Sequence, residues 1–352
     1  MVTAALSAAV ITGLGSAFPH PYAQQSLWDD YFAHHYQGDP LARRLFLGSG
    51  VRIRHSVVDP RREDISDWST AARMRRYLDE APPLGRRAAG DALADAGISA
   101  AELGLFVVVS CTGYATPGLD IQLARELGMA PSVRRLLIGH MGCYAAIPGL
   151  GAAADFVRAR RQPALVLCVE LTSLHAQPAV AHRDLEQVVA HALFGDAATA
   201  VVVLPDAAHG LEILDTTAAT APASEDLMTW HLTDHGFRMG LSPRVPDVLA
   251  HHVGAATATL LAPIAADVTD VGGWAVHPGG PRIVDVVEKR LGLRPEQTAA
   301  TRRILDTRGN CSSGTVLLVL DQLRRGLAAD AVVVAMAFGP GLTLCLALLR
   351  AR

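Results

Sequence analysis

The segment GHMGCYAAIPGL places one cysteine, Cys143, between a glycine and an apolar helical stretch. We expect a strand-to-helix turn here, with Cys143 near the start of the helix. Unpaired backbone N–H groups and the helix dipole at that position favour a thiolate and would lower the pKa of the thiol. Taken alone, the segment favours a buried structural cysteine over a nucleophile. If Cys143 does chemistry, its partners must come from far along the chain, because the residues just after it offer no base.

Two other polar residues, His277 and Asn310, lie in segments with special backbone shapes. His277, in WAVHPGGPRIVD, ends an apolar strand and enters a turn rich in glycine and proline. Such turns let the backbone approach a ligand, and binding sites of α/β proteins usually lie at strand ends. Asn310, in RGNCSSGTVLLVLDQL, precedes an amphipathic helix, and the segment alone favours an ordinary helix cap over a catalytic role. The later turn FGPGLT could line an active site or simply join two strands.

The predicted elements place these residues in two similar halves. Short, continuous apolar runs indicate strands that are covered on both faces, with helical stretches between them. Both halves follow the order strand, helix, strand, helix, helix, strand, strand, which indicates an internal duplication. We therefore predict an N-terminal half over residues 1–208, carrying Cys143, and a C-terminal half over residues 209–352, carrying His277 and Asn310. Packed together through shared helices, two such halves would bury much of a chain that is 50% hydrophobic.

The bounds of these elements follow from the apolar runs. Strands are expected over residues 8–18, 103–113, 163–173, 197–205, 211–220, 271–280, 331–341 and 342–350, and a further strand before Gly142. Helices are expected over residues 84–96, 120–127, 143–160, 185–192, 245–266, 281–291 and 312–325.

Composition and charge argue against several classes of function. A net charge of −3 makes nucleic acid or an anionic membrane an unsuitable main partner. The five cysteines lack the spacing of a metal site, which predicts no metal and a reduced, cytoplasmic protein. The apolar N-terminal segment lacks a basic region, so a first strand is expected rather than a signal peptide. Residues 331–349 are uncharged, but Phe-Gly-Pro-Gly at their centre predicts two strands and a turn, not a membrane span.

In chain order, these motifs resemble the type III polyketide synthases related to chalcone synthase, in the thiolase superfamily. HPGGP, the GN and SS of GNCSS, and FGPGLT are the most specific, and CTGYATPGLD, ELTSLHAQP and LFGDAATAVVV also occur in the family's order. The resemblance covers nearly the whole chain. It implies an α/β, thiolase-like fold with a duplicated αβαβα layered architecture, an acyltransferase that uses coenzyme A thioesters without a bound cofactor, and a homodimer.

The resemblance also implies roles for the three polar residues. Cys143 would take the acyl starter from coenzyme A as a thioester, and a cationic His277 would stabilise its thiolate. His277 and Asn310 would hold the carbonyl of malonyl-CoA during decarboxylation, because the enolate needs donors fixed where charge develops. Repeated condensation would build a poly-β-keto chain that cyclises to a pyrone or to a resorcinol-type phenol.

Further positions are assigned to the cavity and to coenzyme A by the same resemblance. Phe194 matches a gatekeeper phenylalanine, and Met239 stands where the second gatekeeper is usually Phe. Trp230 and His175 occupy positions where some relatives carry smaller residues, which would shorten the pocket and favour a short starter. Synthesis of a long-chain alkylpyrone or alkylresorcinol is the alternative, if a tunnel opens elsewhere. The other expected cavity residues are Cys111, Thr112, Thr172, Ser312, Phe338 and Pro340, and the expected coenzyme A contacts are Arg52, Arg54, Gly279 and Gly280.

Two rival functions share this fold. An initiating β-ketoacyl-carrier-protein synthase also uses Cys, His and Asn, but it typically has HQAN and GFGGG where this chain has HPGGP and FGPGLT. A non-catalytic thiolase-fold subunit would not need all three polar residues, and all three are present here. The sequence therefore favours the polyketide synthase, and it leaves the starter, the number of extensions and the mode of cyclisation open.

Overall fold

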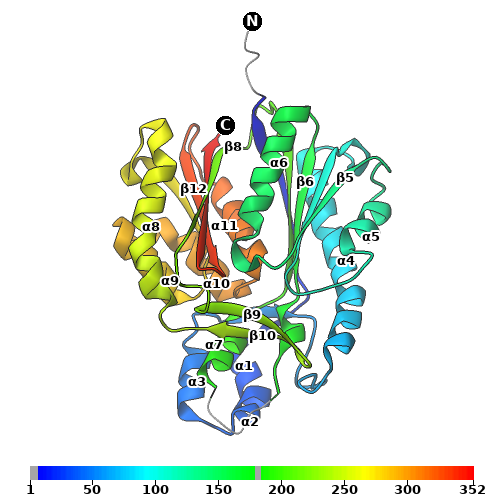
Figure 1. The fold of residues 1–352 in the computed structure, drawn as a ribbon, viewed down its shortest axis with the longest axis vertical. Helices are drawn as coiled ribbons and strands as arrows, with labels where there is room; N and C mark the ends of the chain where they lie inside the picture. The colour runs from blue at the N-terminus through cyan, green and yellow to red at the C-terminus, as the bar shows by residue number, and fades with distance from the viewer. Residues whose placement is uncertain (1–6, 179–183) are drawn as a thin grey trace, which may run out of the picture.

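The computed structural model describes residues 7–178 and 184–352, and a nine-stranded sheet forms its centre (Figure 1). The strand order is β11-β12-β13-β8-β1-β7-β6-β4-β5. The first half supplies β1 (Ala9–Ala17), β4 (Leu105–Val109), β5 (Arg134–Ile138), β6 (Ala164–Glu170) and β7 (Ala197–Pro205). The second half supplies β8 (Leu211–Thr220), β11 (Val271–Val276), β12 (Val332–Gly339) and β13 (Thr343–Ala351).

The two halves meet where β1 lies beside β8. This contact is short, since only Val10 with Glu212 and Ile11 with Leu211 are paired. By contrast, β1 pairs along its length with β7, and β8 does so with β13. Outward from the seam, β7 matches β13, β6 matches β12, and β4 matches β11, with the same parallel and antiparallel pairings in both arms. This correspondence is the duplicated architecture that the element order predicted.

Helices complete five layers, as Figure 1 shows. They are α4 (Thr70–Ala96), α5 (Leu119–Glu126), α6 (Ala146–Arg160), α8 (Val245–Leu261), α9 (Pro281–Leu291) and α11 (Thr315–Arg324). Helices α6 and α11 share one hydrophobic core with the inner faces of both arms of the sheet. Helices α4 and α5 cover the outer face of the first arm, and α8 and α9 cover that of the second. Because both faces are covered, most central strands, such as β4 and β6, are almost wholly apolar, and the predicted αβαβα fold is confirmed.

A smaller lobe, at the bottom of Figure 1, packs beneath the sheet. It consists of β2 (His20–Ala23), α1 (Gln24–Leu27), α2 (Ala33–His35), α3 (Pro40–Leu47), β3 (Ile53–Ser56), α7 (Leu185–Leu193), β9 (Met228–Thr233) and β10 (Gly236–Leu241). Trp28, Phe32 and Phe46 pack against α7 through Val188. Only α7 is expected from the sequence, because the other elements are short.

Elsewhere the bounds follow the apolar pattern closely. Strand β8 and helix α9 have their expected bounds, and Phe-Gly-Pro-Gly lies at the turn from β12 to β13. Helix α4 begins earlier than expected, at Thr70, where Ser69 caps it by accepting a hydrogen bond from the Ala72 N–H. Helix α10 (Ala299–Arg308) is an additional element. Within the described residues, no helix is long and apolar enough to cross a membrane.

Candidate active site

Cys143 lies in a short 3-10 helix, η3 (Gly142–Tyr144), between β5 and α6. Gly142 has φ +73, and a Cβ there would stand 2.8 Å from Cδ of Pro340. Glycine is therefore needed both for the left-handed backbone and for the close approach. This contact presses the nucleophile segment against the turn between β12 and β13, so the FGPGLT motif does more than join two strands.

His277 and Asn310 come from the second half and meet Cys143 at one cavity. His277 follows β11, and its backbone N–H donates to the Met336 carbonyl at 2.8 Å. Asn310 is tied to the first half, because its backbone N–H donates to the Leu193 carbonyl at 2.8 Å. Cys143, His277 and Asn310 all line a cavity of about 420 Å³. The three residues predicted from separate motifs are thus brought together.

The ring of His277 is 1% exposed, and neither ring nitrogen has a hydrogen-bond partner among the described residues. Buried polar atoms are nearly always paired, so an unpaired imidazole that lines a cavity indicates a place for a ligand. The Asn310 side chain, unlike that of His277, has a hydrogen-bond partner in the protein: its Oδ1 accepts from the Ser312 N–H at 2.9 Å. That bond leaves the amide NH₂ to donate. Ser312 has φ +49, a strained backbone of the kind that clusters at active sites.

The pKa values of Cys143 and His277 are shifted in directions opposite to those expected from the sequence. Burial raises the pKa of the Cys143 thiol to about 12, and the hydrogen bonds of Ser312 and Asn310 only partly oppose it. Burial lowers the pKa of His277 to about 3. Burial therefore favours the neutral form of both side chains, contrary to the expected thiolate–imidazolium pair. Burial removes both side chains from water, which disfavours the Cys143 thiolate and the His277 imidazolium alike. For Cys143, this effect outweighs the dipole at the helix start.

A neutral His277 is still chemically useful. One ring nitrogen carries a hydrogen and can donate to a carbonyl oxygen, while the other can accept a proton. With the Asn310 amide it offers two donors to a developing oxyanion, and it can take the proton of Cys143 when the thiol attacks.

Glu170, the last residue of β6, also belongs to the site, although the motifs did not predict it. It is fully buried and accepts hydrogen bonds from the Cys111 N–H at 3.1 Å, the Thr112 hydroxyl at 2.8 Å and the Ser313 hydroxyl at 2.6 Å. Burial raises its pKa to about 6. The signal was present, because Glu170 is the single charged residue in the run PALVLCVE.

Phe194 and Met239 separate the catalytic cavity from a second, smaller one. Both residues line the cavity of about 420 Å³ and also a cavity of about 80 Å³. His175, Trp230 and Thr172 line only the smaller one. The two predicted gatekeepers therefore lie between two chambers, whereas the bulky residues at positions 175 and 230 restrict the second chamber rather than the first. Phe338 lines the catalytic cavity.

The bulky wall of the smaller cavity is held by hydrogen bonds. His175 stacks on Phe237 with ring centroids 4.5 Å apart, and its Nδ1 accepts from the Phe237 N–H. Its Nε2–H is then free to donate to the Thr112 carbonyl at 2.7 Å. The Trp230 Nε1–H donates to the Cys111 carbonyl at 2.8 Å. These hydrogen bonds restrain the rings of His175 and Trp230, which form this wall of the smaller cavity.

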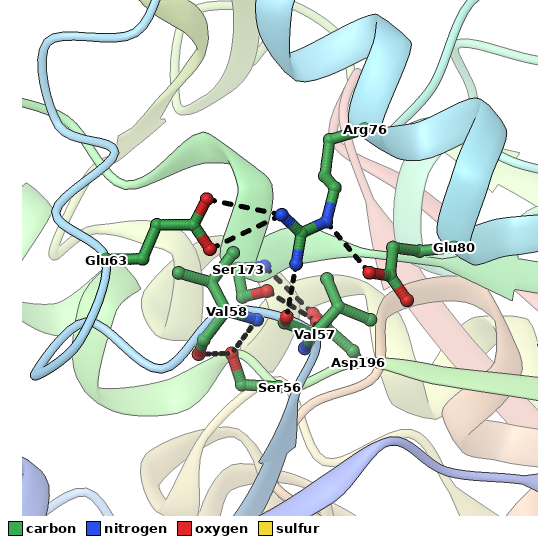
Figure 2. Close-up of polar contacts among 8 residues, drawn as sticks. All are labelled: Ser56, Val57, Val58, Glu63, Arg76, Glu80, Ser173 and Asp196. Atoms are coloured by element: carbon green, nitrogen blue, oxygen red, sulfur yellow. Dashed lines mark hydrogen bonds and ion pairs between the residues drawn. The ribbon is translucent and has the colours of Figure 1, made fainter.

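A polar network lies beside the smaller cavity, which three of its members, Ser56, Val58 and Ser173, line (Figure 2). Asp196 accepts from the N–H groups of Ser173 and Val57, both at 2.8 Å. Arg76 of α4 pairs with Glu63 and Glu80 and reaches the Val57 carbonyl at 3.4 Å. Next to this network, the Thr172 hydroxyl donates to the Gly195 carbonyl. Four other predicted cavity residues, all in the described part of the chain, line neither cavity: Cys111, Thr112, Ser312 and Pro340.

The structure contradicts one of the predicted coenzyme A contacts, Arg54, and leaves the other three as predictions. Arg54 is 7% exposed, donates to the carbonyls of His191 and Phe194, and cannot reach a phosphate in solvent. Arg52 is exposed but binds Asp306 through two hydrogen bonds, and it does not line the catalytic cavity. Arg52 precedes β3 (Ile53–Ser56), whereas Arg54 lies within that strand and is buried there. Gly279 and Gly280 do line the cavity, together with the exposed Arg282 that the sequence analysis missed.

Comparison with known proteins identifies related chains. Residues 1–207 match the N-terminal domain of chalcone and stilbene synthases, and residues 212–352 match their C-terminal domain. The chain is 33% identical to an alpha-pyrone synthesis polyketide synthase-like protein, Pks18, of Mycobacterium tuberculosis and of Mycobacterium bovis, over 95% of this chain and 89% of the relative. PKS-I of the brown alga Ectocarpus siliculosus superposes with a TM-score of 0.91 at 28% identity, covering 99% of this chain and 100% of that one. The C-terminal type III polyketide synthase domain of Steely1 from Dictyostelium gives 0.91 at 27% identity, covering 98% and 99%.

Proposed function

Because the chain belongs to the chalcone and stilbene synthase family of type III polyketide synthases, we propose how its own residues divide the work and which starter it takes. The family reaction joins an acyl-CoA starter to malonyl-CoA by decarboxylating condensation. The main support for this proposal is that Cys143, His277 and Asn310 line one cavity. No cofactor is needed for this division of work, since the two substrates bring the reactive thioesters.

Loading begins at Cys143. As its sulfur attacks the thioester carbon of the acyl-CoA, a ring nitrogen of His277 takes the thiol proton and then returns it to the departing coenzyme A thiolate. The carbonyl oxygen of the starter is held meanwhile by the Asn310 amide. The starter is now a thioester on Cys143, and coenzyme A leaves as a thiol.

Condensation then uses the same two donors. The thioester carbonyl of malonyl-CoA accepts hydrogen bonds from His277 and Asn310, and the bond to its carboxylate breaks to release carbon dioxide. The electron pair left behind forms an enolate, whose charge lies on the oxygen between the two donors. The enolate carbon attacks the acyl thioester and its bond to Cys143 breaks, so the extended chain becomes a β-ketoacyl-CoA and the Cys143 sulfur leaves as a thiolate. Before the next round, that thiolate attacks the thioester of the extended chain, and coenzyme A leaves as a thiolate that takes a proton from water.

We further propose a short starter and few extensions. The chamber behind Phe194 and Met239 holds only about 80 Å³, and His175 and Trp230 are fixed in its wall by hydrogen bonds. A compact triketide or tetraketide suits this space better than a long alkyl chain. The mycobacterial relatives are alpha-pyrone synthesis polyketide synthase-like proteins, which supports an α-pyrone as the product.

A panel of acyl-CoA starters from acetyl to palmitoyl, each with free malonyl-CoA, tests this proposal by mass spectrometry of the products. Pyrones from short starters are the expected result. Efficient turnover of palmitoyl-CoA would overturn the short-starter proposal and favour the long-chain alternative. A strict requirement for a malonyl carrier protein would instead favour an initiating β-ketoacyl synthase.

A homodimer is supported by the outer edge of the first arm. Strand β5 lies at the end of the sheet, and Leu137, next to Leu136 on it, is 51% exposed. Ile121 and Met141 add to the exposed apolar side chains in neighbouring segments. An uncovered edge with large apolar side chains invites pairing with a second copy. Light scattering of wild type and of Leu137→Asp tests this: a dimer that the substitution dissociates is expected, and a wild-type monomer would overturn it.

We place the enzyme in the cytoplasm. All five cysteines are free thiols, as a reducing compartment would keep them. Fractionation of cells followed by immunoblotting is the direct test, and recovery in an extracellular fraction would contradict the proposal.

A further inference from the structure

Glu170 is a buried carboxylate that the reaction itself does not use. It does not line the catalytic cavity, and no described Lys, Arg or His forms an ion pair with it. Its partners are instead the Cys111 N–H, the hydroxyls of Thr112 and Ser313, and the Cys111 thiol at 3.5 Å from each oxygen. A charge kept in the interior without a cation is costly, so stability does not account for a carboxylate here.

These bonds join the two halves of the molecule beside the nucleophile. Cys111 and Thr112 follow β4 of the first half, whereas Ser313 lies in η8 (Ser312–Gly314) of the second half. Asn310 belongs to the same loop as Ser313, and the Cys143 thiol donates to the Ser312 hydroxyl at 3.7 Å. The Cys111 sulfur lies 3.5 Å from that same hydroxyl. One carboxylate therefore holds the loop that carries the Asn310 donor next to the sulfur that carries the acyl chain.

We propose that Glu170 is a positioning residue, which draws residues 310–313 of the second half onto the end of β4 and thereby aligns the Asn310 amide with the Cys143 sulfur. The inference rests on the proposed roles of Cys143 and Asn310 and deepens them. The alignment matters because a displacement of about 1 Å in a catalytic group can lower a rate by about 100-fold.

The ionised form of Glu170 is the form that makes these hydrogen bonds. As a carboxylate it only accepts, which matches the set of donors around it, and on protonation one oxygen becomes a donor. The titratable groups that face it are Tyr77 of α4, Cys111 after β4, Cys143 of η3, Cys168 of β6 and Cys311 before η8, and none of them is a cation. Loosening of the loop is therefore expected as the pH falls through about 6, the raised pKa of this carboxyl.

Two variants test the proposal against the wild type. Glu170→Gln keeps the size of the side chain but offers one acceptor oxygen instead of two, and Ser313→Ala removes a single bond. For each variant we would measure the steady-state kinetics of malonyl-CoA decarboxylation between pH 5 and pH 9, together with the thermal midpoint. Expected are a fall in kcat of about 10- to 100-fold for Glu170→Gln, a smaller fall for Ser313→Ala, and KM within about twofold of wild type. The acidic limb of kcat near pH 6 should be present in wild type and absent in Glu170→Gln.

Unchanged kcat in folded Glu170→Gln, or a rise in KM without loss of kcat, would overturn the proposal. So would an acidic limb that persists in this variant. If Glu170→Gln does not fold, Ser313→Ala decides the matter, because wild-type kcat in that variant would also overturn it. Wild-type protein that neither decarboxylates nor condenses malonyl-CoA would mean that the proposed function has failed, which is a distinguishable result.

Discussion

The two halves of this molecule bring very different surroundings to one cavity. Cys143 and Glu170 of the first half both bind residues of the second: the Cys143 thiol donates to the Ser312 hydroxyl, and Glu170, hydrogen-bonded on both oxygens, accepts from Ser313 as well as from Thr112. In the second half, both ring nitrogens of His277 are buried without a described partner. The first half thus holds its nucleophile within a polar network, whereas the second keeps its imidazole available.

The difference follows from what each group must do. A nucleophile that carries a growing chain has to return to the same place after every round, so a network of fixed contacts suits it. A group that donates to one carbonyl and accepts a proton from a thiol must not be occupied by protein partners. Because buried polar groups are normally paired, the unpaired ring is the stronger sign of function.

Removal of the nucleophile should have the largest effect. Cys143→Ala should abolish condensation and acylation by acyl-CoA, while the fold remains, because Ala is similar in size to Cys. His277 and Asn310 are intact in this variant, so malonyl-CoA decarboxylation should continue. Intact-mass measurement after incubation with acyl-CoA checks the first point, and release of carbon dioxide checks the second. An acyl adduct on the variant would show that another residue is the nucleophile.

Removal of the two hydrogen-bond donors of the second half should impair decarboxylation rather than acylation. His277→Gln and Asn310→Ala should each lower the rate of malonyl-CoA decarboxylation by about 100- to 1000-fold, the usual loss for one oxyanion donor. Carbon dioxide release at saturating malonyl-CoA measures this. Normal decarboxylation in both variants would refute the assigned roles.

The pH dependence of alkylation tests the neutral state of the pair. With the pKa of Cys143 raised to about 12, the thiolate fraction increases about tenfold per pH unit throughout pH 6 to 9. The rate of Cys143 modification by iodoacetamide, followed by intact mass, should rise in the same way without a plateau. Cys143→Ala corrects for the other thiols. A plateau near neutral pH would instead demonstrate a stable thiolate–imidazolium pair.

The smallest predicted effect is that of Glu170→Gln on the pH dependence of stability. Its pKa is raised from 4.5 to about 6, so its contribution to stability is fully present below pH 4.5 and is lost as the pH rises through about 6. This corresponds to about 2 kcal/mol, and Glu170→Gln lacks it. Relative to wild type, the free energy of unfolding of the variant should therefore improve by about 2 kcal/mol between pH 4.5 and pH 7.5. Urea titrations at both pH values measure it, and parallel pH dependence would contradict a buried, raised pKa.

Much of the fold could be predicted where the apolar pattern is strong. β8 and α9 were predicted with their observed bounds, because each is a long segment with a clear period or end signal. The lobe with β9 and β10 was not, since short elements depend on contacts with the rest of the chain. Of the site, the three polar residues were found through motifs, but Glu170 was missed, and Arg54 was misplaced on the surface although it is buried.

By itself, the sequence determined the family, the layered architecture and the three residues that meet at the cavity, because these follow from motifs and from local apolar patterns. Only the tertiary structure decided how those residues are ionised, which chamber the bulky rings narrow, and which carboxylate joins the halves. Ionisation depends on burial, and burial depends on packing between segments far apart in the chain. Cys143 and His277 illustrate this, since the helix start predicted a lowered pKa for the thiol, and desolvation in the assembled cavity reversed it.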